Sequence, residues 1–119
     1  MQYIIRNTNE NYTSINNAFL QDSNLEPATI GILAVILSNK PDWVVYPEEV
    51  ARRLNISRRT INRHFQKLEE AGYMRTLKHS FGGSKGARTY RFFSDMPISD
   101  SYFNYLKDEL ERELSTSGS

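Results

Sequence analysis

The stretch that most constrains the fold is residues 47–73, in which two helical patterns lie on either side of a very short turn. A proline opens the first pattern, and two glutamates follow it where the helix dipole favours negative charge. Ser57 is a natural N-cap for the second helix, and Gly72 tolerates the positive φ at which helices often end. The sequence therefore predicts helices at residues 48–54 and 57–71, joined by a tight turn.

The apolar residues of this stretch form one seam. Ala51 is small at a point where the two helices must approach each other closely. Ile61, Phe65 and Leu68 follow the spacing i, i+4, i+7, which places them on one face of the second helix. We expect a buried seam built from Val50, Leu54, Ile56, Ile61, Phe65 and Leu68.

Patterns on both sides of this helix pair complete the fold. Residues 28–38 follow a proline and are apolar almost all round, which predicts a helix central to the core. Residues 73–78 and 88–93 alternate and carry aromatic or β-branched side chains, with a glycine-rich loop between them. This pattern predicts a β-hairpin with a long tip. A short strand is also expected at residues 43–45.

The two ends of the chain differ in character. Residues 2–6 favour an extended conformation. Towards the other end, apolar side chains at spacings of three and four predict an amphipathic helix at residues 99–114. Its apolar face, which either packs on the domain or forms a dimer seam, consists of Phe103, Leu106, Leu110 and Leu114. Residues 115–119 are expected to form a flexible tail.

The net charge of +1 hides a strong asymmetry. Residues 52–91 contain eleven basic and two acidic side chains, a net charge of +9, whereas the rest of the chain carries −8. A positive field of this density attracts polyanions at close range, because charges beyond a Debye length of ~8 Å are screened. The charge distribution therefore favours a polyanionic partner.

The run Ile56-Ser-Arg-Arg-Thr-Ile61, with Leu68-Glu-Glu-Ala-Gly-Tyr73 after it, resembles the winged helix-turn-helix families of bacterial regulators. The resemblance implies an α+β fold, with a winged helix-turn-helix and its β-hairpin wing at residues 27–94. We expect an N-terminal extended segment, residues 1–26, packed on this domain, and a C-terminal amphipathic helix within residues 95–114. In those families the second helix of the motif reads DNA bases, and the wing contacts backbone or minor groove.

The resemblance also implies how the site would work on double-stranded DNA. Helix 57–71 would enter the major groove, and wing 78–91 would touch backbone or minor groove. Arginine pairs with guanine and asparagine with adenine, so base contacts are expected from Arg58, Arg59, Asn62 and Arg63. Backbone contacts are expected from Ser57, Thr60, Lys67, Lys78, Ser84, Lys85 and Arg88. Ser57 has the alternative role of an N-cap only.

A fainter likeness is carried by the helix at residues 28–37 and by Pro41-Asp-Trp43. These residues resemble small DNA-binding proteins of phages and plasmids of Gram-positive bacteria, including N-terminal domains of replication initiators. Such initiators continue into a further domain that is absent here, so we expect a stand-alone transcriptional regulator of a mobile element. The alternatives are a replication or conjugative-transfer accessory DNA-binding protein, and a winged-helix protein-interaction module.

Several classes of chemistry find no support in the sequence. The chain has no cysteine, which excludes disulfides, cysteine-ligated zinc and thiol catalysis. His64 and His79 are the only histidines, and no acidic cluster accompanies them at ligand spacing. The glycines of residues 82–86 lack the spacing of a phosphate-binding loop. We therefore expect no metal, no cofactor, no small-molecule ligand and no enzymatic activity.

The longest apolar run, residues 30–37, is far shorter than the ~20 residues of a membrane helix. The N-terminal residues also lack the pattern of a secretion signal. We expect a cytoplasmic protein without membrane attachment, with double-stranded DNA as its partner and a homodimer formed through the C-terminal helix as an option.

Overall fold

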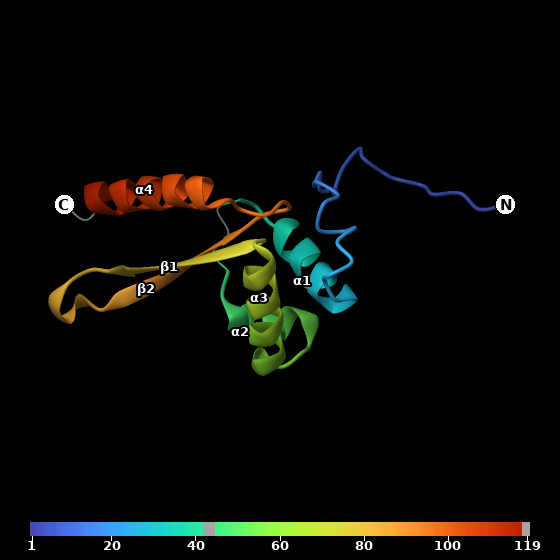
Figure 1. Cartoon of the computed structure of the whole chain (residues 1–119). Coiled ribbons are helices and arrows are strands. Elements are labelled where there is room, and N and C mark those ends of the chain that lie inside the picture. Colours follow the sequence, from blue (N-terminus) through green and yellow to red (C-terminus); the bar gives the residue numbers. More distant parts are fainter. Residues whose placement is uncertain (42–44, 118–119) are drawn as a thin grey trace.

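The computed structural model describes residues 1–41 and 45–117. In this part of the chain three helices precede an antiparallel hairpin, and a further helix follows it (Figure 1). The elements are α1 (Pro27–Leu37), α2 (Pro47–Leu54), α3 (Arg58–Ala71), β1 (Met74–Ser80), a short 3-10 turn (Gly83–Lys85), β2 (Ala87–Phe93) and α4 (Asp100–Ser117). The predicted α+β winged helix-turn-helix with a hairpin wing is confirmed.

The turn between α2 and α3 is built by local hydrogen bonds. Asn55 adopts a left-handed conformation with φ 56°, and the N–H of Ile56 donates to the carbonyl of Ala51 over 3.0 Å. The Ser57 hydroxyl then caps α3 by accepting from the N–H of Thr60 over 3.1 Å. The turn leaves Ile56 36% exposed, so its predicted place in the buried seam is wrong.

The core lies where α1, α2 and α3 meet the base of the hairpin. Leu33 of α1 and Ile61 and Leu68 of α3 are completely buried, and Val50 of α2 packs with them. The rings of Phe65 on α3 and Phe93 on β2 meet edge to face, with centroids 5.4 Å apart. The helical spacing on α3 thus predicted its buried face correctly.

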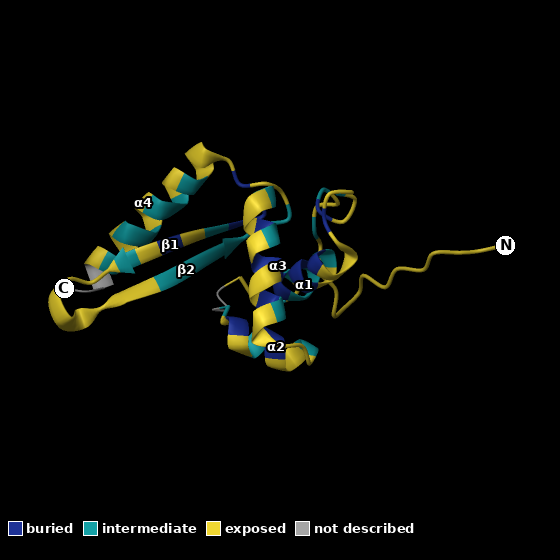
Figure 2. Cartoon of the chain, turned by 60° about the horizontal axis from the view of Figure 1, so that its bottom comes forward, coloured by how far each residue is buried: buried dark blue, intermediate teal, exposed yellow. Residues whose placement is uncertain are grey.

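The hairpin leaves the core and extends into solvent. Met74 pairs with Phe93 at its base and Ser80 with Ala87 near its tip. Burial declines along this length, and the tip is exposed throughout (Figure 2). The tip closes through the N–H of Phe81, which donates to the carbonyl of Gly86 over 2.9 Å.

Helix α4 runs alongside the hairpin, on the face of the sheet turned away from α3 (Figure 1). Arg75 of β1 anchors the start of α4 through Asp100, at 2.7 Å, and through the carbonyl of Ile98, at 2.8 Å. The Phe103 ring meets Phe92 of β2 edge to face, with centroids 6.0 Å apart. Helix α4 ends at Ser117, beyond the expected end at residue 114.

The N-terminal segment has an exposed first part and a second part that packs on the domain. Residues 1–14 are exposed, and the N-terminal end of the chain extends away from the helices (Figure 2). Packing on the domain is confined to residues 15–26, where Phe19 is fully buried. Asp22 accepts a 2.8 Å hydrogen bond from the Tyr73 hydroxyl, and burial together with this carboxylate raises the pKa of Tyr73 to about 12.

The expected strand at residues 43–45 falls largely on residues 42–44, which lie outside the described part of the chain. Within the described part, no helix is both long enough and apolar enough to cross a bilayer.

Candidate nucleic-acid interface

The outward face of α3 carries a row of polar side chains with long reach. Arg59, Asn62, Arg63 and Gln66 are all exposed, and with Thr60 they surround a shallow hollow on the helix surface. The opposite face is buried, because Ile61, His64, Phe65 and Leu68 form part of the core or line it. One face of α3 therefore packs on the core, and the hydrogen-bonding side chains of the other face point to solvent.

Gln66 was not among the residues predicted to contact DNA. It follows Asn62 by four residues, so helical spacing alone places the two side chains on one face. Its amide lies 3.4 Å from a carboxylate oxygen of Glu70, one turn further along. Gln66 is exposed on the same face of α3 as Arg59, Asn62 and Arg63.

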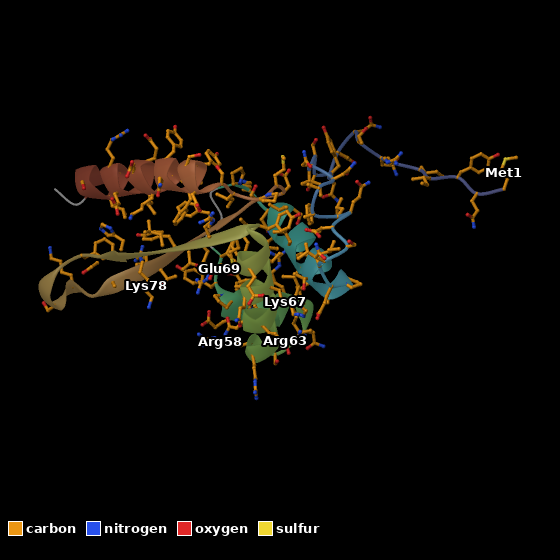
Figure 3. The ribbon with its side chains drawn as sticks, in the orientation of Figure 1. Met1, Arg58, Arg63, Lys67, Glu69 and Lys78 are labelled. Carbon is orange, nitrogen blue, oxygen red and sulfur yellow. The ribbon has the colours of Figure 1, made fainter. Side chains whose placement is uncertain are left out.

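Arg58 lies to one side of this row rather than at its centre. Its guanidinium is 3.0 Å from the carboxylate of Glu48 on α2, and both side chains are more than half exposed. Figure 3 shows Arg58 on the other side of α3 from Arg63 and Lys67. Arg58, which was predicted to contact bases, thus forms an ion pair between α3 and α2.

Arg63 and Lys67 lie on the side of α3 that faces α1. Both approach the carboxylate of Glu26, which stands directly before α1: Lys67 Nζ is 3.0 Å from one oxygen, and Arg63 Nη1 is 3.5 Å from the other. The hydrogen bond from Lys67 is the main reason that the pKa of Glu26 is lowered. Glu26 is therefore an anion in contact with two cations of the predicted site.

His64 links the same region to the core. Its Nδ1 lies 2.7 Å from the hydroxyl oxygen of Thr29, and its Nε2 lies 3.3 Å from Nη2 of Arg63. Because arginine can only donate, Nε2 must accept, which places the proton on Nδ1 and directs it to Thr29. Burial, with the charge of Arg63, lowers the pKa of His64.

The wing carries its predicted residues on different faces. Residues paired across the hairpin share a face, so Lys78 lies with Thr89, and Arg88 lies with His79. The face of Lys78 also carries Thr76, whose hydroxyl donates to Glu69 of α3. Lys78 therefore lies on the α3 side of the wing, and Arg88 on the α4 side.

The hairpin register also reveals Arg91, which was not among the predicted contacts. Arg91 pairs with Thr76, on the same face as Lys78, and lines a groove between α3 and the hairpin together with Asn62 and Gln66. Alternation along β2 was visible in the sequence, but the face that meets α3 depends on how the hairpin packs. Ser84 and Lys85 lie at the exposed tip.

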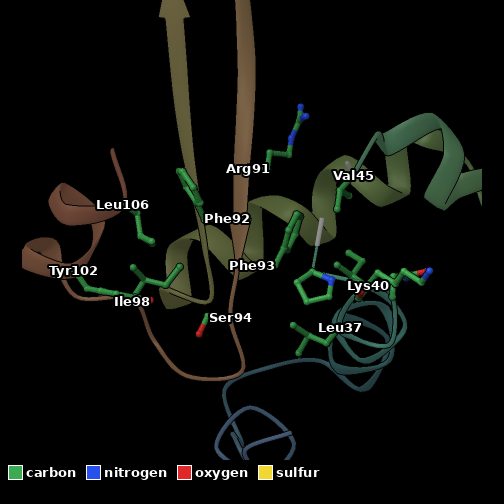
Figure 4. Close-up of a pocket in the computed structure, with 13 residues that line it drawn as sticks. Leu37, Lys40, Val45, Arg91, Phe92, Phe93, Ser94, Ile98, Tyr102 and Leu106 are labelled. Carbon is green, nitrogen blue, oxygen red and sulfur yellow. Dashed lines mark hydrogen bonds between the residues drawn. The ribbon is translucent and has the colours of Figure 1, made fainter. Parts of the chain in front are cut away.

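A cavity of about 410 Å³ lies between the C-terminal end of α1, the end of β2 and the start of α4 (Figure 4). Its described lining is mainly apolar and includes Leu37, Phe92, Ile98 and Leu106. The residues described by the structure contain no group of three or more histidine, aspartate or glutamate side chains placed to hold a metal ion.

Comparison with known proteins agrees with this architecture. Residues 23–78, which contain α1, the helix-turn-helix and most of β1, match the model of the MarR family. The chain is a winged helix-turn-helix protein. The resemblance carried by residues 56–73 is thereby confirmed.

Among solved structures, this winged helix-turn-helix protein is similar to a possible transcriptional regulator from Methanosarcina mazei Go1. The two share 19% sequence identity with a TM-score of 0.46, over 84% of this chain and 82% of the other. No curated protein sequence matches the chain.

Proposed function

We propose that this protein is a transcriptional regulator that binds specific sites on double-stranded DNA, with α3 in the major groove. The observation that carries the proposal is the exposed row of Arg59, Asn62, Arg63 and Gln66 on a helix whose other face is buried. A major groove accommodates one α-helix, and these side-chain types pair bidentately with guanine or adenine edges. Each such pair contributes about 1–3 kcal/mol of discrimination against a wrong base.

Base contacts are proposed for the predicted set, with the glutamine added: Arg58, Arg59, Asn62, Arg63 and Gln66. Arg59 is exposed in the first turn of α3, and no ion pair of its guanidinium is seen among the described residues. The guanidinium groups of Arg58 and Arg63, in contrast, lie 3.0 Å and 3.5 Å from the carboxylates of Glu48 and Glu26. Arg59 is therefore the arginine best prepared to read a base.

Backbone contacts are proposed on both sides of the groove. The start of α3, where the helix dipole favours an anion, offers Ser57 and Thr60, and its middle offers Lys67. The wing offers Lys78 on the α3 side and Ser84, Lys85 and Arg88 at or near the tip. Glycines at the tip permit close approach to a sugar-phosphate chain.

A homodimer formed through α4 is part of the proposal. Four apolar side chains of α4 are only half-buried: Phe103, Leu106, Leu110 and Leu114. The exposed rings of Tyr102 and Tyr105 stack on each other. A second copy would cover this apolar surface and present two copies of α3 to half-sites about one helical turn apart.

The cytoplasm of a bacterial cell that carries a phage or plasmid is the proposed setting. This part rests on the likeness of residues 28–37 and 41–43 to proteins of such elements. The same likeness supports the second candidate, an accessory DNA-binding role in replication or conjugative transfer.

The test is a titration of the protein into its own upstream genomic region and into a random duplex of equal length, at two salt concentrations. Tight binding to the upstream region alone supports a regulator, and equal weak binding to both supports an accessory role. If about six phosphates are neutralised, log K falls against log salt with a slope of about −5. Affinity that does not depend on salt contradicts the proposal.

A further inference from the structure

We propose that Glu26 competes with DNA inside the free protein: its carboxylate holds Arg63 and Lys67 and thereby weakens DNA binding. This inference rests on the proposed function. Glu26 belongs to no predicted set of contacts, yet its two carboxylate oxygens each meet one cation of the candidate interface, at 3.0 Å and 3.5 Å. A DNA strand that uses those cations must displace this carboxylate.

The carboxylate of Glu26 makes no capping hydrogen bond to its own helix. Glu26 occupies the N-cap position of α1, where a side chain usually accepts a hydrogen bond from the first turn, but it makes no such bond. Its backbone is extended, and Pro27 follows it in the first turn. The side chain is therefore directed across to α3, at residues that lie 37 and 41 positions later in the sequence.

Arg63 is engaged at both ends of its guanidinium. Nη1 faces the Glu26 carboxylate, and Nη2 lies 3.3 Å from Nε2 of His64. A bidentate contact with guanine uses two guanidinium N–H groups aimed at the base edge, whereas these two contacts turn the guanidinium towards Glu26 and His64. The geometry thus holds Arg63 back towards the protein in the absence of DNA.

These contacts are placed so that DNA can displace them. The side chains of Arg63, Glu26 and Lys67 are 54%, 45% and 36% exposed. Ion pairs with this exposure contribute little to folding stability and are weakened by salt. DNA can take over the two cations, a base edge for Arg63 and a phosphate for Lys67, without unfolding α1 or α3. The negative charge of Glu26 then remains close to the DNA and repels its phosphates.

The experiment compares wild-type protein with E26Q on the upstream duplex and on a random duplex, at several salt concentrations. Glutamine keeps the shape of the side chain and removes its charge. We expect E26Q to bind both duplexes about threefold to tenfold more tightly, with a salt slope steeper by about one. The matched control is E10Q, the same change at an exposed N-terminal residue, which should leave both affinities within about twofold.

The E26Q substitution is also made in K67M protein, which tests whether the gain in DNA affinity depends on Lys67. In K67M protein the gain from E26Q should shrink, because one of the two released cations is missing. An equal gain in both backgrounds would show a general effect of charge and would overturn the competition. Thermal melting of E26Q should match that of wild type within a few degrees, which separates affinity changes from unfolding.

The outcomes separate the two proposals. If wild type binds DNA and E26Q binds equally or more weakly, the competition is wrong and Glu26 positions its partners instead. If wild type binds no DNA at any salt concentration, the proposed function fails, and this inference fails with it.

Discussion

His64 of α3 and Thr29 of α1 share a hydrogen bond of 2.7 Å, and both side chains are almost fully buried. Among the described residues, Thr29 and His64 are the polar residues buried in the core. Each is the hydrogen-bond partner of the other. Because Arg63 occupies the outer ring nitrogen of His64, this pair connects the core to the exposed face of α3.

Replacing Thr29 by valine should lower the free energy of unfolding by about 1–3 kcal/mol, since the Nδ1–H of His64 would be buried without an acceptor. Valine has nearly the same shape, so the loss reports the hydrogen bond rather than a cavity. Urea denaturation followed by circular dichroism measures it. The exposed Thr13→Val change should cost less than about 0.5 kcal/mol. Equal stability of both variants would show that the buried contact is not needed.

Acid should destabilise the protein through His64. Its pKa in the folded state lies below the ordinary 6.5, so between the two values the unfolded chain binds the proton more readily. The stability from the neutral imidazole is therefore complete above about pH 6.5 and is lost as the pH falls towards the lowered pKa. Thr29, Arg63, Glu26 and Lys67 face or surround this ring.

The measurement is the urea midpoint at about pH 7.5 and about pH 5.5 for wild type and for His64→Gln, which has no titrating ring. Wild type should lose more stability than the variant between these pH values. The same loss in both proteins would assign the acid sensitivity to other groups.

Arg63 and Lys85 should differ in what they contribute to DNA binding. Arg63→Ala should weaken the cognate site by about 1–3 kcal/mol and random DNA much less, because it removes the base contact that we propose for Arg63. Lys85→Ala at the wing tip should weaken both duplexes equally and reduce the salt slope by about one. Equal losses from both variants on every duplex would remove Arg63 from the base-reading set.

Two substitutions of Ser57 separate its role as the N-cap of α3 from its proposed role as a phosphate contact. The structure shows the cap, in which its hydroxyl accepts from the Thr60 N–H over 3.1 Å, so Ser57→Ala should cost about 1 kcal/mol of stability. Ser57→Asp keeps a capping oxygen but adds a negative charge where phosphate is proposed to bind. It should retain the thermal midpoint and lose about tenfold in DNA affinity. Unchanged affinity would leave Ser57 as a cap only.

Much of the fold follows from local rules that a sequence displays directly. Ser57 and Gly72 mark the ends of α3, and the spacing of Ile61, Phe65 and Leu68 identifies its buried face. These features depend on neighbours within one or two turns of the chain, so pattern and propensity suffice to predict them. The hairpin was predictable for the same reason, because a glycine-rich tip separates two alternating segments.

The environment of the site residues was decided by tertiary packing. The sequence shows Arg63 and Lys67 as cations on a helix, but Glu26 lies 37 or more positions away and meets them only because α1 crosses α3. Likewise, the hairpin register places Lys78 and Arg88 on opposite faces, and packing decides which of these faces meets α3. The charged residues and the ends of the helices could be identified from the sequence alone, because both depend on local residues. Which charges neutralise each other depends on distances between segments, and those exist only in the folded chain.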